Sequence, residues 1–263
     1  MAFFDCHFFS DALAQNVSAY VFLPQPTSRQ IGVVAGEALA KYPTLYLLHG
    51  LSDDHTIWLR RTSIERYAAA RNVAVVMPAV ARSFYQDMVS GPSYWSFISE
   101  ELPRLMESFF PLSLERRDRF AAGLSMGGYG ALRLGLLQPE RYAAVASLSG
   151  ALDMTRRAKE AGRQGSALTR AELEAMFGPH LIVEGSTADL FHLAQIRAMS
   201  DGPKPLLYIA CGTEDFILHD TRKFKQHLDS LHIGHVYEEG PGAHEWGYWD
   251  GQIQRVIDWL PVG

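Results

Sequence analysis

Cysteine is scarce in this chain of 263 residues, which carries only Cys6 and Cys211. The two lie far apart and form no CxxC or CxxH pattern, so zinc and iron–sulfur sites are not indicated. We expect two free thiols in a reducing compartment rather than a structural disulfide. The sequence therefore predicts a cytoplasmic protein that holds no metal and needs no cofactor.

Long hydrophobic runs and an excess of positive charge are also missing. No stretch approaches the roughly 18 uninterrupted apolar residues of a membrane helix. The N-terminus has no basic region, and Asp5 and His7 interrupt its apolar run, so we expect neither a signal peptide nor a membrane partner. Lys and Arg total 24 against 29 Asp and Glu, a net charge of −5. This balance argues against nucleic acid as a partner and leaves a homo-oligomer open.

Apolar residues, by contrast, are plentiful. They make up 48% of the chain against 20% charged residues, enough for a large buried core. Six short runs are mostly apolar on both faces, as in parallel strands covered by helices. They cover residues 44–49, 73–77, 119–123, 143–148, 206–211 and 235–238, and stretches with helical period lie between or after them at 63–70, 93–110, 127–137, 221–231 and 245–260. This alternation predicts an α/β protein with a mostly parallel, doubly wound sheet.

Three segments depart from the regular pattern. Residues 3–9 and 17–23 resemble two strands of an antiparallel hairpin at the sheet edge, which brings the expected sheet to eight strands. Pro103 stands inside the helical run 93–110 and should kink or break it. The charged, helix-prone tract of about residues 151–204 has no strand pattern. We expect it to be a small cap-like insertion over one end of the sheet, so that residues 1–263 form a single domain.

The most informative motif is Gly123-Leu124-Ser125-Met126-Gly127-Gly128, which follows a predicted strand and precedes a predicted helix. Glycines two residues before and after the serine allow a tight strand-to-helix turn that would expose the Ser125 hydroxyl. A phosphate-binding interpretation of these glycines fails, because no Lys-Ser/Thr pair follows them. The motif therefore predicts a serine nucleophile at Ser125.

A serine hydroxyl requires a base, and the base requires an acid to orient it. In this type of turn the chain order is serine, acid, histidine. Asp215 follows the strand that ends at Cys211, and the neighbouring Glu214 is the alternative acid. His244 lies in a loop rich in Gly and Pro between the last strand and the last helix. We therefore predict a catalytic triad of Ser125, Asp215 and His244.

Acyl transfer also needs donors for the negative oxygen that forms on the substrate. The backbone N–H of Met126 is one candidate, since it starts the helix after Ser125. The second should come from the loop that follows the strand ending at His49, where we predict the N–H of Leu51. Three tryptophans, Trp58, Trp95 and Trp246, are candidates for contact with the substrate.

These motifs together resemble the esterase D branch of the α/β-hydrolases, and in particular its bacterial tributyrin esterases. The resemblance rests on His49-Gly50-Leu51-Ser52 with Trp58 nearby, Ser99-Glu100-Glu101-Leu102-Pro103, the glycine motif around Ser125, and Gly242-Ala243-His244-Glu245-Trp246. It implies the α/β-hydrolase fold and a serine carboxylesterase that hydrolyses small-molecule esters of short acyl groups, with acetylated or feruloylated carbohydrates among the candidates.

Two alternative functions stay open. S-formylglutathione hydrolases are similar relatives, but they typically carry cysteine after the oxyanion-loop Gly-Leu pair, where this chain has Ser52. A non-catalytic binding protein with the same fold is the other alternative, although such proteins usually lack a triad residue and none is missing here.

Overall fold

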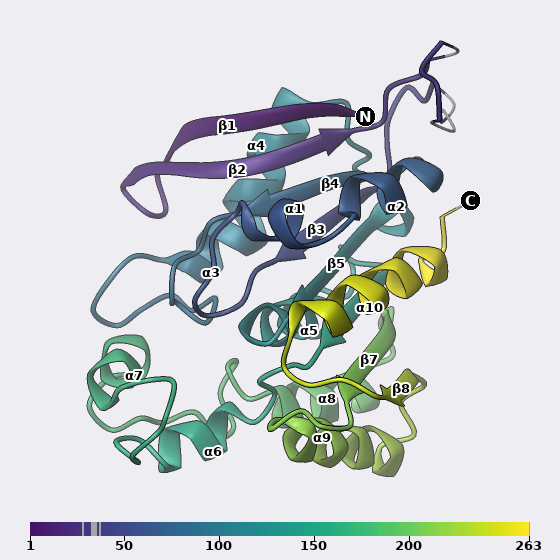
Figure 1. Ribbon diagram of the computed structural model, residues 1–263. Helices are drawn as coiled ribbons and strands as arrows, with labels where there is room; N and C mark the ends of the chain where they lie inside the picture. The colour runs from purple at the N-terminus through teal and green to yellow at the C-terminus, as the bar shows by residue number, and fades with distance from the viewer. Residues whose placement is uncertain (28, 33–35, 37, 263) are drawn as a thin grey trace.

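Eight strands form one sheet in the computed structural model, which describes residues 1–27, 29–32, 36 and 38–262. Their order is β1-β2-β4-β3-β5-β6-β7-β8 (Figure 1). The strands are β1 (Ala2–Ser10), β2 (Gln15–Leu23), β3 (Thr44–Leu48), β4 (Ala74–Pro78), β5 (Arg119–Leu124), β6 (Ala144–Leu148), β7 (Leu206–Gly212) and β8 (Val236–Gly240). The predicted parallel sheet with an antiparallel hairpin at its edge is confirmed, since β1 and β2 pair antiparallel and β4 through β8 are linked by parallel ladders.

Helices cover both faces of this sheet, which is why its central strands are mostly apolar. In β3, Leu45 and Leu47 face one core while Tyr46 and Leu48 face the other, and all four are at most 1% exposed. The first face is covered by α1 (Ile57–Arg61), α2 (Ile64–Ala70) and α10 (Trp246–Trp259). The second is covered by α3 (Tyr94–Ser96), α4 (Leu102–Phe109), α5 (Met126–Leu137), α8 (Leu190–Met199) and α9 (Leu218–Ser230).

The helical run that contains Pro103 is divided, as its sequence predicts. A π-helical turn over Phe97–Glu101 separates α3 from α4, and Pro103 lies in the first turn of α4. Residues 94–109 are helical without a gap, so Pro103 interrupts the ladder of hydrogen bonds inside this run because it has no N–H to donate. The carbonyl four residues earlier, that of Ser99, accepts from the Arg141 guanidinium at 2.6 Å instead.

Residues 151–204, all of them described, contain helices and no strand. The helices are α6 (Met154–Lys159), α7 (Arg170–Phe177) and α8. Helix α8 packs against α5 and α9, while α6 and α7 extend beyond the lower left end of the sheet in Figure 1. Helix α7 is tied to the loop after β4, because Arg82 binds Glu172 at 2.6 Å and the Ser90 N–H donates to the Ala175 carbonyl at 2.9 Å.

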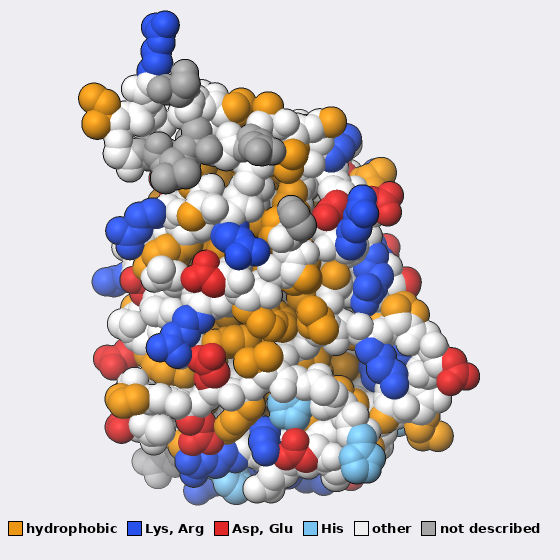
Figure 2. All heavy atoms as spheres, turned by 90° about the vertical axis from the view of Figure 1, so that its right-hand side faces the viewer, with side chains coloured by type: hydrophobic (Ala, Val, Ile, Leu, Met, Phe, Trp, Pro, Cys, Tyr) orange, Lys and Arg blue, Asp and Glu red, His pale blue; other side chains and the backbone are white. Residues whose placement is uncertain are grey.

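The surface mixes charges of both signs. On the face shown in Figure 2, Lys and Arg side chains are interspersed with Asp and Glu around a band of hydrophobic side chains. In the described part of the chain, no helix is long and apolar enough to cross a membrane. Cys6 and Cys211 are both free, and Cys211 is buried.

Glu101 anchors the N-terminal hairpin to the rest of the molecule. Its side chain is nearly buried, at 8% exposure, and accepts hydrogen bonds from the loop that joins β1 to β2. The donors are the Ser10 hydroxyl, the Asp11 N–H at 2.7 Å and the Ala12 N–H at 3.3 Å. One carboxylate thus satisfies three donors that the turn would otherwise leave unpaired.

We predict that Glu101→Ala lowers the free energy of unfolding by roughly 3 kcal/mol, because it leaves these donors without their charged acceptor. Urea denaturation measures the change. Glu100→Ala is the matched control, since Glu100 is exposed and its ion pair with Arg141 should contribute less than about 1 kcal/mol. Equal losses in the two variants would contradict this role of Glu101.

Candidate active site

Ser125 occupies a sharp turn between β5 and α5. Its φ of 52° and ψ of −114° lie where a residue with a side chain is rarely found, and such strain persists only when the surroundings hold it. Two hydrogen bonds do so: the Ser125 N–H donates to the Leu148 carbonyl at 2.9 Å, and the Ala151 N–H donates to the Ser125 carbonyl at 3.0 Å. The end of β6 thereby fixes the serine at the end of β5.

The glycines of this motif permit a close approach of α5 to the sheet. A Cβ atom on Gly127 would lie 2.3 Å from the Leu48 carbonyl oxygen, and one on Gly123 would lie 2.4 Å from the Gly127 carbonyl carbon. Both obstacles are backbone atoms, which cannot rotate away. Gly127 therefore lets the first turn of α5 lie directly against the end of β3, and Gly123 lets the same turn lie against the end of β5.

The two predicted oxyanion donors lie on the two sides of this contact. Met126 is the first residue of α5, where an N–H has no intrahelical acceptor. Leu51 follows the end of β3, and no hydrogen bond between described residues uses its N–H. The turn around it is closed by the Asp53 N–H, which donates to the Gly50 carbonyl at 3.3 Å.

His49 fixes this loop, a role that the sequence analysis did not assign. Its imidazole is 1% exposed, Nδ1 donates to the Gly50 carbonyl at 2.7 Å, and Nε2 accepts from the Val80 N–H at 3.0 Å. Burial lowers the pKa of His49 to about 4, so the ring is neutral near pH 7. Its carbonyl also accepts from the Tyr85 hydroxyl at 3.0 Å. The loop after β3 is thus bound to the loop after β4.

Asp215 and His244 are hydrogen-bonded to each other. Nδ1 of His244 lies 2.9 Å and 3.1 Å from the two carboxylate oxygens, and Oδ1 of Asp215 also accepts from the Ile217 N–H at 3.0 Å. Burial by itself would raise the pKa of Asp215, but hydrogen bonds from His244, the Ile217 N–H and the Ser149 hydroxyl outweigh it and lower that pKa. The carboxylate is therefore ionised at neutral pH.

Glu214, the alternative acid, points elsewhere. Its carboxylate accepts from the Gly242 N–H at 2.6 Å and from the Thr213 hydroxyl at 2.8 Å. This links the loop after β7 to the loop after β8. The two loops also touch directly, because a Cβ atom on Gly212 would lie 2.0 Å from the Gly242 carbonyl oxygen.

Aromatic rings enclose the His244 imidazole. The Phe216 ring lies over it with centroids 4.6 Å apart, and the Trp249 ring meets it edge-on at 4.8 Å. The Trp249 indole N–H donates to the hydroxyl of buried Ser149 at 3.1 Å. Phe216 is 79% exposed. Its place next to Asp215 in the chain is the one signal that could have identified it, whereas Ser149 and Trp249 come from distant segments.

The three tryptophans lie in different surroundings. Trp58 is 1% exposed and donates its indole N–H to the Leu48 carbonyl at 3.0 Å, so it supports the end of β3 from within the core and has no surface left for a substrate. Trp246 is half-buried and packs edge-on against Trp58 and Trp249, at 5.2 Å in each case. Trp95 is half-buried beneath the guanidinium of Arg133, which lies 4.0 Å from its ring centre.

A cavity of about 530 Å³ lies beside the triad loop, between residues 156–167 and Phe216. Arg156 and Arg157 line it, but both also face the buried carboxylate of Asp220, at 2.7 Å and 3.6 Å. Much of their charge is therefore neutralised within the protein. Over the described residues, no group of three or more His, Cys, Asp or Glu side chains could hold a metal ion.

Ser125, Asp215 and His244 follow β5, β7 and β8, which are parallel. Parallel strands end at the same edge of a sheet, so the three residues gather there with the loop after β3. A strained serine at a helix start and a hydrogen-bonded Asp–His pair at the same sheet edge are parts that acyl transfer needs, and the N–H groups of Leu51 and Met126 are the candidates for its oxyanion donors.

Known proteins share this architecture along the whole chain. The family model described as "Putative esterase" matches residues 10–260. An acetyl esterase of Caldicellulosiruptor saccharolyticus is 32% identical over 264 residues, covering 99% of this chain and 98% of that protein.

Two solved structures from Staphylococcus aureus are similar. One is the fluorophosphonate-binding serine hydrolase F with substrate bound (TM-score 0.87), the other an S-formylglutathione hydrolase apoenzyme (TM-score 0.84). Each is 33% identical, and the match covers 98% of both chains. The chain therefore belongs to this esterase family and is a serine esterase, a carboxylic ester hydrolase with an esterase D-like α/β-hydrolase fold.

Proposed function

We propose that Ser125 is the nucleophile, His244 the general base and Asp215 the acid that orients the base. The observation that carries this assignment is the strained Ser125 turn at the same sheet edge as the Asp215–His244 hydrogen bond. Because Nδ1 of His244 donates to Asp215, its Nε2 has the lone pair needed to accept a proton. His244 then takes the Ser125 proton as the hydroxyl attacks the ester carbonyl.

The reaction proceeds through an acyl-enzyme. Attack forms a tetrahedral intermediate, whose negative oxygen accepts hydrogen bonds from the N–H groups of Leu51 and Met126. Each such donor stabilises the transition state by roughly 3 kcal/mol in related sites. Collapse breaks the ester C–O bond, and His244 passes its proton to the departing alkoxide. His244 next deprotonates a water molecule, which attacks the acyl group and releases the acid and Ser125.

We further propose short acyl esters as substrates, with acetylated or feruloylated carbohydrates among the candidates. The similarity to an acetyl esterase supports a short acyl group. The helices of residues 151–204 have six, eight and ten residues, none of them a long apolar lid. In this proposal they form a small cap on a single domain, and Trp246, next to the His244 loop, is the tryptophan best placed to contact substrate.

The cellular setting is part of the same proposal. Two free cysteines support a reducing, cytoplasmic environment. The expected partners are small-molecule esters and no nucleic acid.

Ser125→Ala should lower kcat/KM for p-nitrophenyl acetate at least about 10⁴-fold, because water must then attack without a covalent intermediate. Initial-rate kinetics measures this loss. Ser108→Ala, an exposed serine on α4, is the control and should leave the rate unchanged. Near-wild-type hydrolysis by Ser125→Ala would refute the assignment.

Asp215→Asn should lower kcat by about 10⁴-fold with little change in KM, because the amide can hold His244 in the wrong tautomer. Steady-state kinetics separates the two constants. Glu214→Gln is the matched neighbour and should cost less than about tenfold, since it touches only the loop. A larger loss in Glu214→Gln than in Asp215→Asn would reverse the assignment of the acid.

The acyl-length profile tests the substrate class. For p-nitrophenyl esters, kcat/KM should be highest for acetyl and butyryl groups and fall for longer chains. We expect no long apolar groove in which added methylenes could be buried. S-formylglutathione, assayed in parallel, should be a poorer substrate than the short oxygen esters, since Ser52 replaces the cysteine of those hydrolases. A profile that rises beyond about eight carbons would contradict the short-chain proposal.

A further inference from the structure

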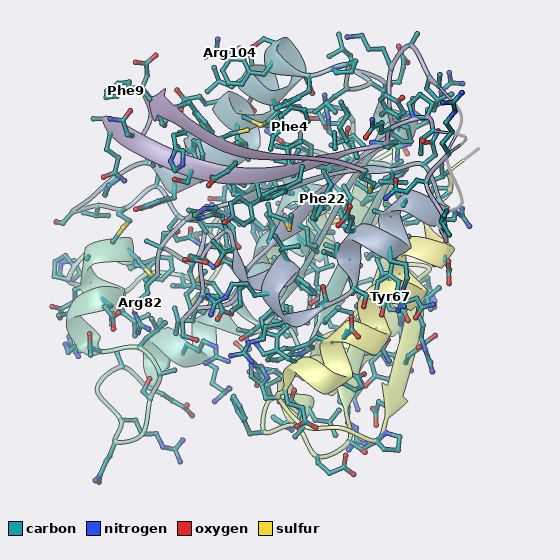
Figure 3. The ribbon with its side chains drawn as sticks, turned by 45° about the horizontal axis from the view of Figure 1, so that its top comes forward. Phe4, Phe9, Phe22, Tyr67, Arg82 and Arg104 are labelled. Atoms are coloured by element: carbon teal, nitrogen blue, oxygen red, sulfur yellow. The ribbon has the colours of Figure 1, made fainter. Side chains whose placement is uncertain are left out.

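Strand β1 has one unpaired edge. It is the first strand of the sheet and nine residues long, and among the residues that the structure describes it pairs only with β2. Figure 1 shows it as the uppermost strand, and Figure 3 looks onto it with Phe4 and Phe9 labelled. Its outer edge presents a row of backbone N–H and C=O groups that can pair with another strand. Phe3 and Phe9 on the same strand are 46% and 56% exposed.

The opposite edge of the sheet is protected in a way that β1 is not. Strand β8 has only five residues. Its Glu238 and Glu239 pair with Arg255 and Arg222, at 3.0 Å and 2.6 Å. Short length and charged side chains are the usual means of keeping an edge strand from pairing. The exposed aromatic residues on β1 instead favour pairing with another strand.

The sequence of β1 is complementary to itself when it is reversed. Residues 3–9 read Phe-Phe-Asp-Cys-His-Phe-Phe, and Cys6 is the midpoint of the strand Ala2–Ser10. Two copies aligned antiparallel along their full length are therefore centred on Cys6. In that register Phe3 faces Phe9, Phe4 faces Phe8, and Asp5 faces His7. A two-fold symmetric interface needs this self-complementarity, because each patch meets its own copy.

Both faces of such a strand pair would bring favourable side chains together. Asp5 and His7 lie on the solvent face, where their side chains are 48% and 67% exposed and already attract each other at 3.2 Å within one chain. In the pair each would also face the other residue type across the strands, where the Asp5 carboxylate can accept a hydrogen bond from the imidazole of the partner copy. On the other face, Phe8 packs near Phe109 of α4 with centroids 6.2 Å apart, and Phe109 is 53% exposed.

We propose that β1 is a docking surface for a second copy of this chain, and that the two β1 strands pair antiparallel about Cys6 to join the two sheets. The dimer covers the exposed Phe side chains and removes the open edge of the sheet. The proposed catalytic residues Ser125, Asp215 and His244 follow β5, β7 and β8, which are separated from β1 in the sheet by β2, β4 and β3.

Cross-linking at Cys6 tests the register directly. Opposed residues in an antiparallel pair have Cα atoms about 4.5–5.5 Å apart, a distance that a disulfide can span. Mild oxidation of the native protein should yield a dimer joined at Cys6, and Cys6→Ser should abolish it. Cys211→Ser, which removes a buried thiol, should not. The mass by light scattering before oxidation should be about twice 29.3 kDa.

Charge exchange tests the pairing without a covalent bond. His7→Glu places Glu opposite Asp5 at two symmetric positions and should weaken dimerisation at least about tenfold. The double variant Asp5→Lys, His7→Glu sets Lys opposite Glu at both positions and should restore the dimer. Hydrolysis of p-nitrophenyl acetate per chain should be the same in all of them, so failure of the dimer and failure of the catalytic assignment are distinguishable. A monomeric native protein, or a dimer indifferent to both substitutions and not cross-linked at Cys6, would overturn the proposal.

Discussion

Helix α5 begins in direct contact with the end of β3. This is possible because Gly127 has no side chain that would clash with the Leu48 carbonyl. This contact determines how close the Met126 N–H can come to the loop that holds Leu51. It also determines the conformation of Ser125, which must turn sharply from β5 into a helix that lies so near the sheet. The nucleophile and both proposed oxyanion donors therefore depend on one backbone approach.

Buried polar groups hold the loops around this contact. His49 bridges the loops after β3 and β4, and the neutral form imposed by burial lets one ring nitrogen donate and the other accept. Asp215 is also buried and accepts a hydrogen bond from His244 in the loop after β8. The exposed Glu214 adds a second link between the loops after β7 and β8. Such groups are costly to bury without partners, so each hydrogen bond fixes a loop as well as satisfying an atom. A site built in this way is organised before substrate arrives.

Most of the fold could be predicted from the sequence, because local patterns of apolar residues, glycine and proline determine where its strands and helices begin and end. Apolar runs bounded by glycine and proline identify the strands, and Pro103 identifies the break before α4. The same local logic located the turn at Ser125. Contacts between distant segments were not accessible in this way: the bond from Trp249 to Ser149 joins residues 100 positions apart. Trp58 shows the limit, since its residue type suggested substrate contact while its hydrogen bond to Leu48 buries it in the core.

A crystal structure of the enzyme inactivated with a small fluorophosphonate tests the proposed site most directly. It should show a phosphonyl group on Ser125 Oγ, with its oxygen within about 3.1 Å of the backbone nitrogens of both Leu51 and Met126. His244 should remain bound to Asp215 in that structure. A phosphonyl oxygen directed away from these two nitrogens, or an adduct on another residue, would contradict the proposed site.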